Sequence, residues 1–148
     1  MTTTPLTLPE FLLARYREDE AAARAAIGTA AFGQQTGRWR LDQVSDQFGP
    51  TPIVFALVDD GAKTQVANLE AAWERNERGT HIARHNPARV LDDVEAKRKI
   101  VDAYNEMTED PEVAAQRYQQ VATFRYVLEV MAQPYKDHPQ YRQEWRRP

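Results

Sequence analysis

Apolar residues recur with helical spacing along the first part of the chain. They are Leu8, Phe11, Leu12, Tyr16, Ala23, Ala26 and Ile27. Thr7 and Glu10 precede them with the spacing of a capping box, in which the Thr7 hydroxyl accepts from the Glu10 amide and Glu10 reaches back. Gly28 is a typical helix stop. The pattern predicts one long N-terminal helix.

The apolar spacing changes to alternation after residue 38. Trp39 and Leu41 are separated by polar neighbours, as in a half-buried strand. Ile53–Val58 is rich in strand-forming residues, and Lys63–Ala67 would be the returning strand. Asp60-Gly61 between them is a signal for a type I′ hairpin turn. The sequence therefore predicts a small three-stranded antiparallel meander.

Helical patterns return in the second half of the chain. Leu69–Arg75 is predicted to be helical and to end by Gly79, and Thr80 to restart a short helix through His85. Asn86-Pro87 then supplies a cap and a first-turn proline, which together start a long helix. The residues predicted to line its inward side are Val90, Leu91, Val94, Val101 and Tyr104.

A second cap-and-proline signal, Asp110-Pro111, opens the last long helix. The sequence predicts continuous helix from Glu109 to Glu129, and Gln133-Pro134 as its end. The residues predicted to face inward are Ala114, Tyr118, Val121, Phe124, Leu128 and Met131.

The tail, residues 133–148, is polar but carries three aromatic side chains. Aromatic side chains in such a segment must dock on something or expose apolar surface. Packing on its own domain is favoured over contact with a second subunit or another protein. For the latter case the candidate partner-binding residues are Tyr135, His138, Tyr141 and Trp145.

These elements predict a single α+β domain over residues 1–148, with a core over about 7–132 and a docked aromatic tail over 133–148. Hydrophobic residues make up 42% and charged residues 28%, which is ordinary for a globular protein. The start of the chain lacks the features of a signal peptide, and no apolar run is long enough to span a bilayer. The expected location is therefore the cytoplasm.

The charge, the cysteine content and the absent motifs argue against several classes of function. The net charge of −3 disfavours broad attraction to nucleic acid, and the basic run Lys97-Arg98-Lys99 lies beside Asp92, Asp93 and Glu95. Because the chain contains no cysteine, disulfides, thiolate metal sites and cysteine nucleophiles are excluded. Nucleotide-binding glycine loops and the serine hydrolase motif do not occur.

Two histidines offer a candidate metal site. His81 and His85 are four residues apart, so on one helix they face the same way and could share a zinc ion. Glu77 or His138 would be the third ligand, but Gly79 and Thr80 argue against a helix that continues back to Glu77. The zincin motif is incomplete here, so a structural role for the pair is favoured.

Three blocks of the chain, residues 11–26, 81–100 and 132–147, resemble a family catalogued as domain of unknown function 6221. Trp39 and the Asp60-Gly61 turn also fit. The resemblance implies an intracellular protein of an actinobacterium or its phage, and it implies no reaction. Many relatives carry cysteines before the third block, which suggests zinc; this chain lacks them.

The leading hypothesis is a non-enzymatic accessory or regulatory protein of actinobacterial or phage origin that acts through protein contacts, with an unidentified protein or a second copy as partner. The first alternative is a metal-binding module or metal-dependent enzyme that uses His81 and His85. The second is a DNA-associated phage regulator, which would bind with steep salt dependence.

Overall fold

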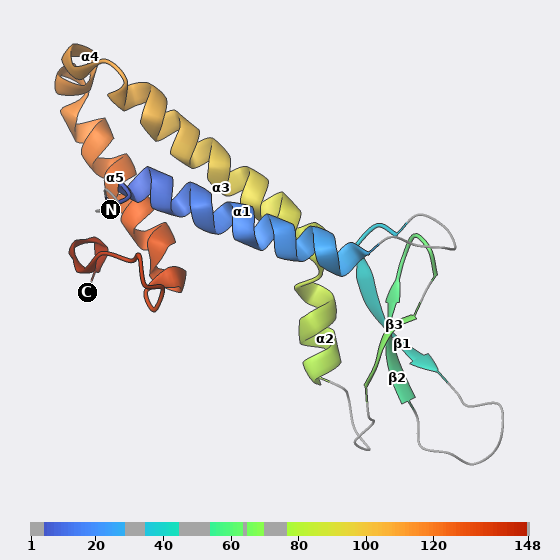
Figure 1. Ribbon diagram of the computed structural model, residues 1–148. Coiled ribbons are helices and arrows are strands. Elements are labelled where there is room, and N and C mark those ends of the chain that lie inside the picture. Colours follow the sequence, from blue (N-terminus) through green and yellow to red (C-terminus); the bar gives the residue numbers. More distant parts are fainter. Residues whose placement is uncertain (1–4, 29–34, 45–53, 64, 70–76, 148) are drawn as a thin grey trace. The chain divides into compact units, whose positions relative to one another are not determined.

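The structure, a computed structural model, describes residues 5–28, 35–44, 54–63, 65–69 and 77–147 (Figure 1). The chain divides into two compact units. Unit 1 consists of residues 1–19 and 94–148, and unit 2 of residues 20–93. The single domain expected over residues 1–148 stays a prediction, because two compact units can belong to one folding domain.

The described helices and strands confirm the predicted α+β class. In chain order they are α1 (Leu8–Ile27), β1 (Trp39–Val44), β2 (Val54–Asp59), β3 (Gln65–Leu69), α2 (Glu77–Arg84), α3 (Pro87–Thr108), α4 (Pro111–Gln116) and α5 (Tyr118–Ala132). Two short 3₁₀ turns follow in the tail, Gln133–Tyr135 and Gln143–Trp145. In the described part of the chain, no helix is long and apolar enough to cross a membrane.

Local capping signals place the helix ends as the sequence predicted. Asn86 caps α3, because its Oδ1 accepts from the Arg89 N–H at 3.0 Å. Asp110 caps α4 by accepting from the Glu112 N–H at 2.8 Å. Gly28 follows the last residue of α1 with φ of 71°, the left-handed conformation that commonly ends helices.

The N-terminal cap of α1 differs in one detail from the predicted capping box. The Glu10 carboxylate does reach back, accepting from the Thr7 N–H at 2.8 Å. The Thr7 hydroxyl, however, donates to the same carboxylate at 2.7 Å instead of accepting from the Glu10 amide. The backbone N–H of Thr7 and then its hydroxyl lower the pKa of Glu10.

The predicted continuous helix from Glu109 to Glu129 is wrong. It is divided into α4 and α5 at Arg117, whose φ of −106° and ψ of 25° lie outside the helical region. Tyr118, predicted to face inward, is the first residue of α5 and is 74% exposed, whereas Leu128 is fully buried as expected.

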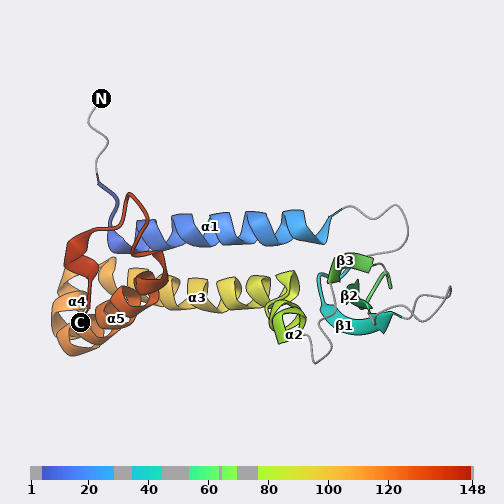
Figure 2. The same ribbon diagram turned by 90° about the horizontal axis from the view of Figure 1, so that it is seen from below.

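Unit 1 has a core built from three helices and the tail. In both views the tail lies against the first turns of α1, and α5 turns back from α4 (Figures 1 and 2). The buried hydrophobic residues of this unit are Leu8, Phe11, Leu12, Tyr16, Val94, Val101, Leu128, Ala132, Tyr141 and Trp145. Within unit 1, the predicted α1 and α3 stripes contribute Leu8, Phe11, Leu12, Tyr16, Val94 and Val101 to this core, whereas Ala26 of the predicted α1 stripe is exposed.

Unit 2 contains the predicted meander, with strand order β1-β2-β3 and both pairs antiparallel. Trp39 stands opposite Asp59, and the register shifts at Leu57/Val58 on the β3 side. Helix α2 packs on β1 and β2. It runs through Gly79, where the sequence predicted a break, and Gly79 is buried. The predicted helix 69–75 begins on a β3 residue and otherwise lies outside the described residues.

A buried carboxylate, Asp59 at the end of β2, organises the hairpin of unit 2. It accepts from four backbone N–H groups at 2.8–3.2 Å, those of Thr36, Gly37, Gly61 and Ala62. Desolvation raises the pKa of Asp59, but the backbone donors outweigh it, and the pKa is lower than usual.

The predicted type I′ turn at Asp60-Gly61 is wrong. Positive φ falls on Lys63 (53°), not on Gly61. The Lys63 N–H donates to the Asp59 carbonyl at 2.9 Å, so the chain turns over a longer loop than two residues. The cause is the Asp59 side chain, which holds the N–H groups of Gly61 and Ala62 and thereby shapes the first half of the turn.

Candidate functional site

Phe11 of α1 is the centre on which the tail docks. Its ring makes edge-on or tilted contacts with four tail rings, at centroid distances of 5.0–6.4 Å. These rings belong to Tyr135, His138, Tyr141 and Trp145. Offset and edge-to-face pairs of this kind add to the stabilisation that burial alone gives. The sequence-predicted tail residues are therefore brought together in one cluster.

Polar contacts surround this aromatic cluster. The buried Arg15 guanidinium lies 2.6 Å from His138 Nδ1 and 2.6 Å from a Glu18 carboxylate oxygen. Because a guanidinium only donates hydrogen bonds, the contacted imidazole nitrogen must be the acceptor. The Tyr135 hydroxyl donates to Asp19 at 2.5 Å. The bonds to His138 and Tyr135 tie the tail to the part of α1 that follows Phe11.

The end of the tail is anchored on α5. Glu129 is buried, and its carboxylate forms ion pairs with Arg125 (3.3 Å) and Arg147. Gln133 donates to the Trp145 carbonyl at 3.0 Å and to the Tyr141 hydroxyl at 3.1 Å. A buried carboxylate needs such partners, because an unpaired charge in this position would be costly.

Burial decides which role the tail side chains can have while the tail is docked. Trp145 is only 1% exposed and Tyr141 is buried, so neither can touch a second molecule in this conformation. The sequence analysis favoured packing on the same domain, and the contacts with Phe11 are of that kind. A role of the tail in partner binding stays a prediction.

A row of exposed apolar side chains on α5, which the sequence analysis missed, is the most accessible apolar surface of unit 1. Tyr118 is 74% exposed, Tyr126 53% and Val130 45%. Ala122, also exposed, completes the row, which we call the α5 row. The four residues recur every fourth position and therefore form one ridge along the helix. The i, i+4 spacing was visible in the sequence, but Tyr118 had been assigned to the core.

Arginines flank the α5 row. Arg147 lies with its guanidinium carbon 5.5 Å from the centroid of the Tyr126 ring. Arg125 and Arg147 are about half exposed, with side-chain values of 55% and 45%, although both pair with Glu129. Arg117, at the start of the row, is exposed as well. The row is thus an apolar ridge with a positively charged margin.

The two candidate metal ligands lie together at the end of α2 in unit 2, His81 in its last turn and His85 directly after its final residue. His81 and His85 are both exposed, and their ring centroids are 4.6 Å apart. Because α2 runs from Glu77, this residue stands one turn before His81 on the same row. Among the described residues, however, no three His, Asp or Glu side chains form a group that could hold a metal ion. His138 belongs to the other unit.

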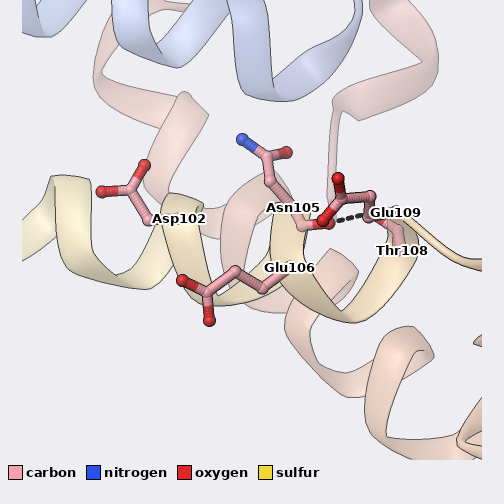
Figure 3. A pocket seen from close by; sticks show the side chains of 5 residues that line it. All are labelled: Asp102, Asn105, Glu106, Thr108 and Glu109. Atoms are coloured by element: carbon pink, nitrogen blue, oxygen red, sulfur yellow. Dashed lines mark hydrogen bonds between the residues drawn. The ribbon is translucent and has the colours of Figure 1, made fainter.

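A shallow hollow of about 500 Å³ lies at the end of α3 in unit 1 (Figure 3). It is lined by Asp102, Asn105, Glu106, Thr108 and Glu109. All five come from one continuous segment, residues 102–109, and Figure 3 shows that the three carboxylates do not converge on one point. The hollow lacks the apolar walls and opposed functional groups of a typical substrate pocket.

The basic run on α3 is partly neutralised. Lys99 forms an ion pair with Glu95 at 2.8 Å, and this hydrogen bond raises the pKa of Lys99 and lowers that of Glu95. Lys97 lies 6.0 Å from the centre of the Tyr16 ring. Neighbouring side chains of this run thus point to different partners, which does not favour a continuous nucleic-acid surface.

Comparison with known proteins gives one match. A family model described as a family of unknown function, DUF6221, matches residues 6–147. No curated protein and no solved structure matches the chain.

Proposed function

Because the chain belongs to the DUF6221 family, whose description assigns no activity, we propose a function from its own surfaces. It is a non-enzymatic accessory or regulatory protein of an actinobacterium or its phage, and it acts in the cytoplasm through contacts with another protein. The contact surface is the α5 row, and the docked tail holds α5 in place for it.

The observation that carries this proposal is the exposure of Tyr118 and Tyr126 on one helical ridge. Single exposed apolar side chains need no explanation, but several on one ridge mark an interaction surface. Tyrosine and arginine are also the residue types enriched at the centres of protein interfaces. Both types occur together here, since Arg147 at the margin of the α5 row lies over Tyr126.

The charge at the margin of the row indicates what the partner presents. Arg117, Arg125 and Arg147 surround apolar side chains, so a complementary surface has an apolar centre with carboxylates beside it. An acidic amphipathic helix is one surface of this kind. The partial pairing of Arg125 and Arg147 with Glu129 favours protein over nucleic acid, which requires cations free to neutralise phosphates.

A second copy of the chain is a less suitable partner for the α5 row. Two α5 helices paired antiparallel along Tyr118 to Val130 would have their two-fold axis near Phe124. Arg125 of both copies would then lie next to the axis, where like charges repel. We therefore commit to a different, acidic protein.

The test is affinity capture of the tagged full chain from nuclease-treated actinobacterial lysate, quantified by mass spectrometry. The variant Tyr118→Ser/Tyr126→Ser removes both rings from exposed positions, so it should leave the core intact. We expect one acidic protein to be recovered in stoichiometric amount with the wild type, and about tenfold less or none with this variant.

The matched control is Ile82→Ser, which also removes an exposed apolar side chain but lies on α2. It should recover the partner as the wild type does. Equal recovery with all three proteins, or recovery of the bait alone, would contradict the proposal. A deletion of the tail is not a suitable variant, because it removes Trp145 from the core.

A further inference from the structure

We propose that His81 and His85 form a two-ligand chelate for a borderline divalent transition metal, of which Cu²⁺ is the tightest-binding member and Zn²⁺ another. The site lies on α2 of unit 2, so it is independent of the contact function proposed for α5. It goes beyond that function because it assigns a metal to this chain.

The geometry of α2 brings the two imidazoles within reach of one ion. The rings are separated by one helical turn, and their centroids lie 4.6 Å apart with an angle of 41° between planes. Two imidazole nitrogens bound to one ion lie about 3.3 Å apart, given metal–nitrogen distances of about 2.0–2.1 Å. Rotation of exposed side chains covers this difference, and it requires no movement of the backbone.

The surroundings of the pair leave the imidazoles available. Within the described residues, neither imidazole is hydrogen-bonded to a carboxylate, as a purely structural histidine would be; the contact that each makes is with the other ring. The opposite side of α2, including Gly79, packs on the sheet, which keeps both histidines on the solvent side. The helix on which they sit is therefore fixed while the ligands remain free to turn.

Hydrogen bonds fix the backbone that carries the two histidines. His81 lies in the last turn of α2, and the His85 N–H donates to its carbonyl at 3.0 Å. The Ala83 carbonyl accepts from the Asn86 side-chain amide at 2.8 Å, and the carbonyl of the final helical residue accepts from the Arg89 guanidinium at 3.3 Å. The two histidines are therefore held one turn apart, and chelation requires only rotation of their side chains.

The donor set determines the class of metal. Imidazole nitrogen binds Cu²⁺, Ni²⁺ and Zn²⁺, and Cu²⁺ has the highest affinity among these ions. Two protein ligands are fewer than the three of a catalytic zinc site or the four of a structural one. The proposal therefore requires only these two protein ligands, with water in the remaining positions of the ion.

The test uses Cu²⁺ as the probe, with the full chain, isothermal titration calorimetry and electron paramagnetic resonance. We expect one ion per chain and a nitrogen splitting pattern from two imidazoles. Joining two ligands on one scaffold raises affinity by about a hundredfold or more over one ligand, so His85→Ala should weaken binding by about that factor.

The decisive control is Ile82→His/His85→Ala, which keeps the number of histidines but places them on adjacent residues of α2. Adjacent side chains on a helix diverge by about 100°, so this variant should bind as weakly as His85→Ala. His138→Ala should bind as the wild type does. Unchanged affinity in Ile82→His/His85→Ala, or a spectrum with a single nitrogen ligand, would overturn the proposal. Circular dichroism confirms that each variant folds.

Discussion

The two compact units of this chain are stabilised by different means. In unit 1, large side chains from residues far apart in sequence meet around Phe11, and their rings fill the core. In unit 2, the organising group is the Asp59 carboxylate, which binds backbone N–H groups from two segments. One buried carboxylate thus joins the backbone before β1 to the hairpin, whereas unit 1 joins its distant segments through aromatic rings.

Each unit uses a different physical effect to join its segments. A buried aromatic side chain removes about 150–250 Å² from water, so a few rings provide most of a core in unit 1. In unit 2 the Asp59 carboxylate is fully buried, and an unpaired charge there would be costly. Its four backbone donors therefore fix the hairpin against the backbone of Thr36 and Gly37.

The strongest test of this comparison is Trp145→Ala. Its ring is almost fully buried and contacts both Phe11 and Tyr141, so its removal should lower the free energy of unfolding by about 3–5 kcal/mol. Hydrogen exchange should then accelerate at α5 amides. The amides of β1 and β2 should keep their protection, since their unit is organised by Asp59.

The control for this prediction is Arg146→Ala, which changes an exposed neighbour in the tail. It should leave urea unfolding unchanged within about 0.5 kcal/mol. Equal loss of protection in β1, β2 and α5 on Trp145→Ala would show that the two units unfold together, and the comparison would fail.

Sequence reasoning succeeded where the signals are local. The Asn86 and Asp110 caps, the Gly28 stop and the alternation at Trp39 each depend on a few neighbouring residues, and each is found in the structure. The tail packs around Phe11 through contacts between residues that are far apart in the sequence. The sequence could predict that the aromatic side chains of the tail would be buried, but it could not predict that Phe11 is the residue they contact.

Other features could not be predicted because no local residue announces them. The helix break at Arg117 involves neither glycine nor proline, and arginine is a good helix former. The burial of Glu129 has no local signal, because its partner Arg147 lies 18 residues further along the chain. In the candidate sites, the spacing of the His81 and His85 pair and of the α5 row was visible in the sequence, but the exposure of the α5 row was not.

The dependence of unit 2 on Asp59 can be tested by lowering the pH. Its pKa is lower in the folded state than the ordinary carboxyl value, so the unfolded state binds the proton more readily. The stabilisation is complete above the ordinary value of about 3.9 and is lost as pH falls through the folded value. We expect acid to release the protection of β1 and β2 amides before that of α5, measured by hydrogen exchange between pH 6 and pH 2.5.

Asp59→Asn separates this effect from general acid unfolding. The amide keeps one acceptor oxygen but turns an NH₂ group toward an N–H donor such as that of Gly37, which should cost about 2 kcal/mol at pH 7. Because the amide does not titrate, the variant should lose less stability between pH 6 and pH 3 than the wild type. A parallel pH dependence in both proteins would assign the acid transition to other carboxylates.

The smallest expected effect comes from two glycines of unit 2 that share a φ of 71°. A Cβ added at Gly28 would meet only the Gln35 amide oxygen, at 3.6 Å. Gly28→Ala should therefore lower the free energy of unfolding by about 1 kcal/mol, which is the cost of placing alanine in the left-handed conformation. At Gly37 the new Cβ lies 2.7 Å from Ile27 Cγ1. Gly37→Ala must therefore also displace this side chain, and urea unfolding should show a loss about 1 kcal/mol greater than for Gly28→Ala.

Because Gly28 and Gly37 have the same φ, the difference in stability between the two alanine variants measures the effect of close packing alone. Gly37 also donates to Asp59 and accepts from the Ala88 N–H at 3.2 Å, so a shift there disturbs the carboxylate network that organises the sheet. Hydrogen exchange in Gly37→Ala should accelerate at β1 and β2 but not at α5. An equal loss of stability in the two glycine variants would mean that the Ile27 side chain moves aside at no cost. Close packing at Gly37 would then contribute nothing beyond the effect of its φ.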